Sequence, residues 1–330
     1  MTPAAPRPAL LRPLISADTS GIRVVALGGG HGLAASLSAL RHLTGELTAV
    51  VTVADDGGSS GRLRRELGVL PPGDLRMALA ALCDDTPWGR TWRDVLQHRF
   101  ACPGELHHHA VGNLLIVALW ELLGDTVQGL DLVGQLLGAR GRVLPMSAVP
   151  LEIEAVVLGL VEGDPAAATV VRGQVAVATT EGHVASVRLV PDDPPARPEA
   201  VSAVMAADWV VLGPGSWFTS VMPHLLVPDL RRALYDTPAR RMITLNLTNQ
   251  AGETDGFSAE NHLEALFVHA PELRADVVLA DPAAVTDRRS LEQVCHSVGA
   301  RLVVSSVAAS GRPEVHDELR LAAAYRDIVG

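Results

Sequence analysis

VVTVADDGGSSGRLRRELGVLPPGDLR, residues 50–76, is the stretch that decides the fold of this chain. It opens as an apolar, β-branched run typical of a buried strand and stops at two acidic residues, after which come glycines and serines. Glycine permits positive φ and lets a ligand approach the main chain, and free N–H groups and hydroxyls bind anions. We therefore expect a buried strand to open into a polar pocket. The residues expected to line it are Asp55, Asp56, Gly57, Gly58, Ser59 and Ser60.

The two acidic residues, Asp55 and Asp56, stand at the lip of this pocket. A carboxylate in that position suits a ribose or sugar hydroxyl, a cation such as Mg²⁺, or general-base catalysis. These roles stay open, and both residues are candidates for catalysis if a reaction occurs. Residues 71–74 then form a second rigid turn, and Asp74 is expected to be the N-cap of a helix over 75–82.

Upstream, an apolar run at 22–27 ends in the glycine-rich segment 28–32, and leucines at helical spacing follow. A strand, a glycine turn and a helix in this order direct helix N–H groups and the positive end of the helix dipole at the turn, which suits a phosphate. Asp55 lies 27 residues after Gly28, near the place where dinucleotide-binding folds put a ribose-binding acid. The expected ligand-binding residues of this turn are Gly28, Gly29, Gly30, His31 and Gly32.

A second strand-to-glycine transition occurs downstream, where the predicted buried strand 208–212 ends in Gly213, Pro214, Gly215 and Ser216. Another predicted strand, at 242–245, is followed by a polar cluster that begins with Asn246. Amides there would read the edge of a base or sugar, or serve as ordinary turn residues. Since open parallel sheets bind ligands beyond the carboxyl ends of their strands, we expect these loops to converge on one crevice.

Composition restricts the function. With 48% hydrophobic and 19% charged residues, the chain has ample material for a core. A net charge of -10 and few aromatic residues argue against nucleic-acid binding. The absence of lysine excludes a Walker A lysine and a pyridoxal Schiff base. Three cysteines without CxxC spacing predict free thiols in a reducing cytoplasm. No stretch resembles a membrane span, and residues 1–21 are expected to be a disordered tail.

Residues 140–195 have strand-like patterns separated by turns, at 142–144, 153–160, 170–179 and 184–190, and predict a small antiparallel insertion. Strands and helices alternate elsewhere, with a last helix expected at 314–325. That alternation predicts the α/β class, with a mainly parallel sheet between two layers of helices, in one domain over 22–330. Three adjacent histidines at 107–109 cannot all face one metal in a regular element, so no firm metal site is predicted; His109 is placed at the pocket.

Several motifs, in order and spacing, resemble the YvcK/CofD-like family, and most closely its YvcK branch, the gluconeogenesis factors. They are GGGHGL, ADDGGSSG with PPGDLR, HAVGNLL, GPGSW and NLTNQAGET. The resemblance spans residues 22–281. It implies a Rossmann-like three-layer α/β/α core with a small β-rich insertion, binding of UDP-sugars, and a role in cell shape and wall synthesis during gluconeogenic growth. The sister branch contains Mg²⁺-dependent 2-phospho-L-lactate transferases. The resemblance adds Asp74 and Asn113 to the pocket.

Three functions remain open. The leading hypothesis is a regulatory protein that binds a nucleotide-linked sugar, with the glycine turns and serines on the diphosphate. Without a lysine or a nucleophile triad, covalent catalysis is disfavoured. The rival is a transferase of phosphorus-containing groups with Mg²⁺ at Asp55. The third is an NAD-dependent dehydrogenase, and NAD would at least fit the crevice as an adventitious ligand. A homo-oligomer and a protein partner from cell-wall synthesis are further expectations.

Overall fold

The computed structural model describes residues 21–250, 253–254 and 256–330, so almost all of the expected N-terminal tail lies outside the described residues. A seven-stranded sheet forms the centre, and every neighbouring pair of its strands is parallel. In spatial order the strands are β10 (Arg301–Val304), β9 (Val277–Ala280), β8 (Arg240–Thr244), β7 (Trp209–Leu212), β1 (Val24–Gly28), β2 (Leu47–Val51) and β3 (Arg142–Pro145).

Near-continuous apolar sequence explains this sheet. Every residue of β1, β7 and β9 is buried, as strands must be when helices cover both faces of a sheet. The larger helices are α1 (Gly30–Leu40), α2 (Gly58–Leu67), α3 (Gly73–Leu82), α4 (Pro87–Gln97), α5 (Val111–Leu123), α6 (Thr126–Leu137), α8 (Pro198–Ala206), α10 (Pro228–Asp236), α11 (Ala259–His269), α12 (Arg288–Ser297) and α13 (Glu318–Val329).

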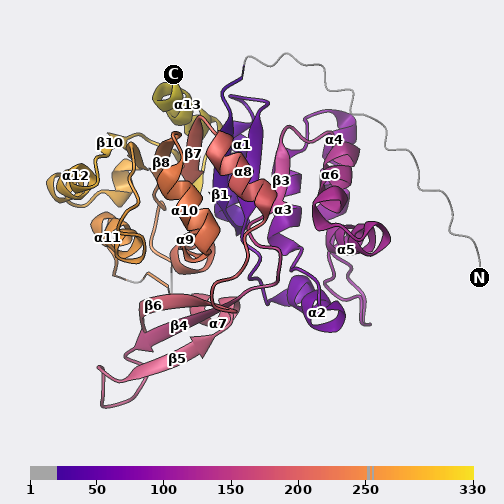
Figure 1. Ribbon diagram of the computed structural model, residues 1–330, viewed down its shortest axis with the longest axis horizontal. Coiled ribbons are helices and arrows are strands. Elements are labelled where there is room, and N and C mark those ends of the chain that lie inside the picture. The colour runs from indigo at the N-terminus through magenta and orange to yellow at the C-terminus, as the bar shows by residue number, and fades with distance from the viewer. Residues whose placement is uncertain (1–20, 251–252, 255) are drawn as a thin grey trace, which may run out of the picture.

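Two helical layers enclose the sheet (Figure 1). Helix α1 packs against α3 and α13, and α8 packs against α10. Right-handed crossovers put these two groups on opposite faces, because the chain runs from β1 toward β3 and later from β7 toward β10. The expected α/β/α architecture with a mainly parallel sheet is therefore confirmed.

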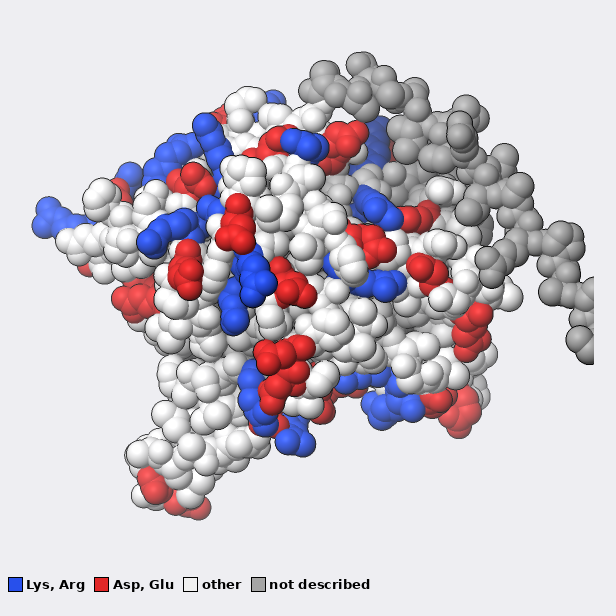
Figure 2. Space-filling view, viewed as in Figure 1, with Lys and Arg blue, Asp and Glu red and all other residues white. Residues whose placement is uncertain are grey.

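A three-stranded antiparallel sheet projects from this body (Figures 1 and 2). Its strands are β5 (Ala168–Arg172), β4 (Glu152–Leu158) and β6 (His183–Val190), in that spatial order. Two expectations were wrong here. The segment 142–144 belongs to β3, which pairs with β2 in the central sheet. The expected strand 170–179 is split, because Gly173 turns the chain at φ 96° into a short helix, α7 (Gln174–Ala178).

Helix α2 was missed, since its glycines and serines were interpreted as a loop. Residues 62–67 are good helix formers, and the helix extends back to Gly58 because small residues fit its crowded first turn. A Cβ at Gly61 would overlap the carbonyl of Asp56. The N-cap expectation for Asp74 was also wrong: Pro72 is the N-cap of α3, and Asp74 lies in the first turn of that helix.

The helix expected at 314–325 is present as α13 (Glu318–Val329), but it begins later than expected, because a hairpin occupies residues 308–316. Strands β11 (Ala308–Ala309) and β12 (Arg312–His316) pair antiparallel around Gly311, whose φ of 73° suits a tight turn. Asp317 then caps α13, its carboxylate accepting hydrogen bonds from the next backbone N–H groups. Local apolar spacing alone did not indicate the hairpin.

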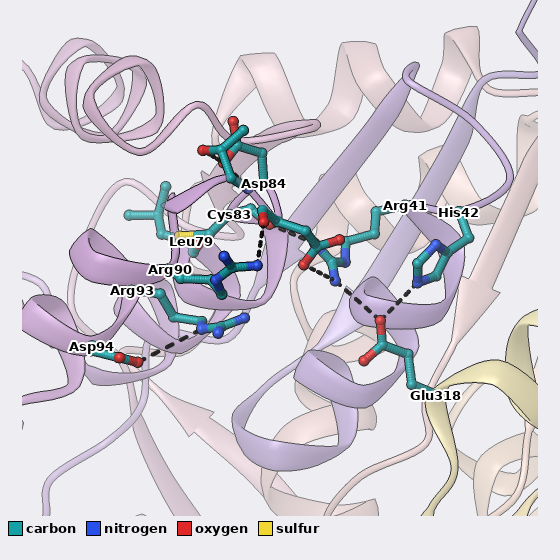
Figure 3. A network of polar contacts seen from close by, with 11 residues as sticks. Arg41, His42, Leu79, Cys83, Asp84, Arg90, Arg93, Asp94 and Glu318 are labelled. Carbon is teal, nitrogen blue, oxygen red and sulfur yellow. Dashed lines mark hydrogen bonds and ion pairs between the residues drawn. The ribbon is translucent and has the colours of Figure 1, made fainter. Parts of the chain in front are cut away.

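A buried arginine ties the end of α1 to two other segments (Figure 3). Arg41 donates to the carbonyl of Cys83 and lies 3.1 Å from both Asp85 and Glu318. These contacts fix the C-terminal end of α1 against α13. They thereby also restrict the position of the glycine turn at the N-terminal end of the same helix. In the described part of the chain, no helix is long and apolar enough to cross a membrane.

Candidate functional site

The two glycine turns lie against each other where the sheet changes direction. β1 and β7 are neighbours, and the chain leaves them toward opposite edges, which is the switch point where open α/β sheets bind ligands. A Cβ at Gly32 would overlap the carbonyl oxygen of Pro214 and the Cα of Gly215. Only glycine therefore allows the first turn of α1 to contact the 213–216 turn.

The end of β8 holds the second glycine turn in place. The Asn246 side chain accepts a hydrogen bond from Gly215 N at 2.8 Å and donates to Gly215 O at 2.9 Å. The oxygen and the nitrogen of the Asn246 amide therefore both bond to the backbone of Gly215, and these two bonds restrict the conformation of the 213–216 turn. The predicted role of Asn246 in reading a ligand edge thus competes with a structural role visible in its contacts.

The loop after β2 is joined to the start of α3. Asp55 accepts hydrogen bonds from Gly57 N at 2.9 Å and from the Ser60 hydroxyl. The Ser60 oxygen in turn accepts from Gly73 N at 3.0 Å. The Ser60 hydroxyl is consequently used to shape the loop, and its proton is directed to a carboxylate rather than to a ligand.

A second carboxylate lies beside Asp55. Asp74 accepts a hydrogen bond from the backbone of Gly30, which connects α3 to the first glycine turn, and a Cβ at Gly29 would contact it. Burial raises the pKa of Asp74 to about 7, with a further contribution from the charge of Asp55. Burial also raises the pKa of Asp55. Two partly desolvated carboxyl groups therefore lie side by side at the carboxyl ends of β1 and β2.

Ser59 is the centre of a buried polar cluster. Its oxygen accepts hydrogen bonds from Asn113 Nδ2 at 3.1 Å and from Ala110 N at 3.3 Å, and it lies 3.0 Å from His109 Nδ1. The hydroxyl has a single proton, so it donates one hydrogen bond, to Nδ1 of His109, and the imidazole that accepts it is neutral. Burial lowers the pKa of His109, in agreement with that assignment. Ser59 thus joins α2 to α5.

Arg76 extends this cluster and was not predicted as a site residue. Its Nε donates to Asn113 Oδ1 at 2.9 Å, and the side chain is buried. Burial lowers its pKa to about 10. Among the described residues its Nη1 has no hydrogen-bond partner. The guanidinium of Arg76 lies near Asp55 and Asp74, and its charge compensates part of theirs. No local sequence pattern indicated this burial.

Glu253 is a buried carboxylate that stabilises the 213–216 turn and the residues that follow it. Its Oε2 accepts from Trp217 N at 2.9 Å, and the hydroxyls of Ser216 and Thr219 also donate to it. Burial raises the pKa of its carboxyl group. The Ser216 hydroxyl, like those of Ser59 and Ser60, is therefore directed at a protein acceptor.

Two predicted site residues are placed differently from the rest. His31 is exposed at the start of α1. Asp56 faces the insertion: its Oδ1 accepts a hydrogen bond from Val175 N at 3.1 Å, and its Oδ2 packs on Gly173. The insertion is therefore fastened to the loop that carries Asp55. Within the described ranges, no group of three or more His, Cys, Asp or Glu side chains is placed to hold a metal ion.

The Asp56 contact predicts a local change in hydrogen exchange. In Asp56→Ala, we expect exchange of the Val175 amide to rise roughly tenfold, because a charge-assisted hydrogen bond at the surface is lost. Exchange mass spectrometry on peptides covering 173–178 measures it. Asp192→Ala removes another exposed carboxylate near the insertion, one that pairs with Arg188, and should leave Val175 unchanged. Equal exchange in wild type and Asp56→Ala would contradict the proposed fastening.

Comparisons with known proteins show the family to which the chain is related. The family model described as 2-phospho-L-lactate transferase CofD matches residues 24–306. A relative from Mycobacterium tuberculosis, named "Putative gluconeogenesis factor", is 56% identical over 303 residues, covering 91% of this chain and 88% of the relative. A "Gluconeogenesis factor" from Halalkalibacterium halodurans is 38% identical over 264 residues, covering 80% and 79%.

A solved structure has the same fold. The crystal structure of a UPF0052 family member from Bacillus halodurans superposes with a TM-score of 0.81 at 32% identity, covering 92% of this chain and 98% of that one. The family match extends from β1 through β10 and so includes both glycine turns and the Asp55–Asp74 pair. The chain therefore belongs to the CofD family, among relatives that are named gluconeogenesis factors.

Proposed function

We propose that this protein binds a nucleotide-linked sugar of the UDP-sugar class at the switch point and acts as a regulatory protein. Its role would be in cell shape and cell-wall synthesis during growth on gluconeogenic carbon. The names of the relatives support the metabolic context. The observation that carries the proposal is the contact between the two glycine turns, which leaves main-chain N–H groups beside the N-terminus of an eleven-residue helix.

Main-chain groups are the donors we assign to the diphosphate. The three serines predicted to bind the diphosphate, Ser59, Ser60 and Ser216, already donate to protein acceptors. The N–H of Gly30 donates to Asp74, but the N–H groups of His31 and Gly32 in the same first turn have no partner within α1, and the helix dipole favours negative charge there. In this proposal the serines keep the loops in shape, and the backbone binds the anion.

Asp55 is assigned to a hydroxyl of the ribose or of the sugar. It follows β2, as the ribose-binding acid does in dinucleotide folds. The half-buried Asp55 carboxylate accepts two protein hydrogen bonds and still has free lone pairs, so one ligand hydroxyl can be added.

A second candidate function is a Mg²⁺-dependent transfer of a phosphorus-containing group. It is favoured by the proximity of Asp55 and Asp74, whose pKa values are both raised, because a cation between them would offset their repulsion. Mg²⁺ is commonly held by one or two carboxylates together with substrate phosphates, and these two acids fit that requirement. When bound, the ion would neutralise charge on the phosphates. The protein would contribute positioning through the same glycine turns.

Calorimetry with a panel of UDP-sugars, with and without Mg²⁺, tests the proposal. We expect saturable binding to wild-type protein, weakened at least tenfold in Asp55→Asn, since a charge-assisted hydrogen bond is lost. Asp327→Asn changes an exposed carboxylate on α13 and should bind as wild type does. If wild-type protein binds no UDP-sugar, the binding proposal fails. Release of UDP or UMP with turnover would favour the transferase.

A further inference from the structure

A cavity of about 280 Å³ opens beside the second glycine turn, at the carboxyl ends of β8 and β9. Its volume is below that of a pocket for a whole drug-sized ligand, so it suits one part of a larger molecule. Its wall includes Asn246, Thr248, Asn249, Phe257 and His262. A larger cavity of about 410 Å³ lies between α1 and α13 at the opposite end of the sheet, away from the glycine turns.

Asn246 connects the cavity to the proposed diphosphate site. Its side chain lines the cavity and also makes both hydrogen bonds to Gly215. Gly215 in turn packs on Gly32, at the start of α1. A ligand whose phosphates bind at α1 can therefore extend past Gly215 into the cavity without crossing a helix.

The cavity has an aromatic wall. Phe257 is half-buried and packs edge-on against His262 and Phe218, with ring centroids 5.4 and 6.1 Å apart. On the insertion side it lies 5.7 Å from His183. Neighbours thus hold the ring in one orientation, and a flat heterocycle can stack on a fixed aromatic face at little entropic cost.

Hydrogen-bonding groups of both kinds accompany this wall. His262 Nδ1 lies 2.9 Å from the carbonyl of Ser258, so it carries the ring proton and Nε2 is an acceptor. In the described part of the chain Nε2 has no partner, and the residue is 5% exposed. The exposed side chains of Thr248 and Asn249 add a hydroxyl and an amide, which both donate and accept.

On the β2 side of the crevice, helices α2 and α5 leave no room for a nucleotide base. Dinucleotide folds place a nucleoside beyond the end of β2, but here α2 begins at once after the Asp55 loop. The buried cluster of Ser59, His109 and Asn113 fills the space between α2 and α5. The nucleoside, with its ribose, is then placed on the β8–β9 side, which leaves Asp55, after β2, to bind a hydroxyl of the sugar.

We propose that this cavity is the base subsite, and that it takes a planar heterocyclic base with ring N–H and carbonyl groups, of the pyrimidine class. The inference rests on the proposed function and deepens it. Phe257 stacks on the ring, His262 accepts a ring N–H, and Asn249 and Thr248 bind the carbonyl edge.

Calorimetry with UDP and with inorganic pyrophosphate tests the subsite. Phe257→Ala should weaken UDP binding by roughly ten- to a hundredfold, the effect of losing one stacked base, and leave pyrophosphate binding unchanged. Asn249→Ala, at an exposed position, should weaken UDP binding severalfold without affecting stability. Val268→Ala, 77% exposed on the same helix as His262, is the matched control and should bind UDP as wild type does.

The outcomes separate the two proposals. If wild type binds UDP, and Phe257→Ala and Asn249→Ala bind it equally well, the base subsite is wrong while nucleotide binding stands. If both variants lose UDP and pyrophosphate equally, the change reflects the turns rather than the base, and the subsite is again overturned. If wild type binds neither UDP nor UDP-sugars, both proposals fail. Thermal unfolding of each variant verifies that it is folded.

Discussion

Replacing Gly32 by alanine should lower the free energy of unfolding by roughly 3 kcal/mol and weaken UDP-sugar binding at least tenfold. The added methyl group would overlap the backbone of Pro214 and Gly215, and backbone cannot move aside as a flexible side chain can. The 213–216 turn is also held by Asn246, so the strain falls on the contact between the two turns. Urea unfolding and calorimetry measure the two effects.

Gly134→Ala is the matched control for this substitution. Gly134 lies within α6, and the nearest atoms to its added Cβ would be 3.8 Å and 3.9 Å away, at ordinary contact distance. Because alanine favours helix over glycine, we expect this variant to gain about 0.5–1 kcal/mol and to bind ligand normally. A Gly32→Ala protein as stable as wild type would show that the two turns are not in contact.

Asp74→Asn should stabilise the protein at pH 8 by roughly 2–4 kcal/mol and flatten its dependence on pH. The folded-state pKa of Asp74 is raised to about 7 from 3.8, so the folded protein binds more protons than the unfolded chain between these values. Stability of the wild type therefore falls as the pH rises from about 4 to about 7. Asparagine has no charge to desolvate, and the penalty disappears.

Urea unfolding at several pH values between 5 and 8 tests this second expectation. The curves for wild type and Asp74→Asn should converge toward low pH and separate toward pH 8, with a smaller slope left in the variant because the pKa of Asp55 is raised too. Asp327→Asn should follow the wild-type curve, since that carboxylate is exposed. Parallel curves for wild type and Asp74→Asn would contradict the desolvated acid pair. An acid pair that lowers stability in this way is expected where the carboxylates serve the proposed ligand site.

The polar side chains of the site show where sequence reasoning stopped. Ser59 and Ser60 were predicted to bind phosphate because they stand in a glycine-rich segment after a strand. Their hydroxyls instead bind partners 50 and 13 residues away, at His109 and Gly73. A side chain's hydrogen-bond partner depends on which segments pack beside it, and no local pattern contains that information. Arg76 was overlooked for the same reason, because its burial results from packing against α5.

The sequence by itself determined the apolar strands of the central sheet, the two glycine turns and their order along the chain. Apolar β-branched runs bury wherever they pair, and glycine is required wherever a turn needs positive φ or close approach, so both are local properties. Only the tertiary structure decided that Gly32 contacts Pro214, that Asp74 lies beside Asp55, and that Asp56 turns away to the insertion. These relations depend on strand order and on helices packing across the sheet, which place residues distant in sequence within hydrogen-bonding distance.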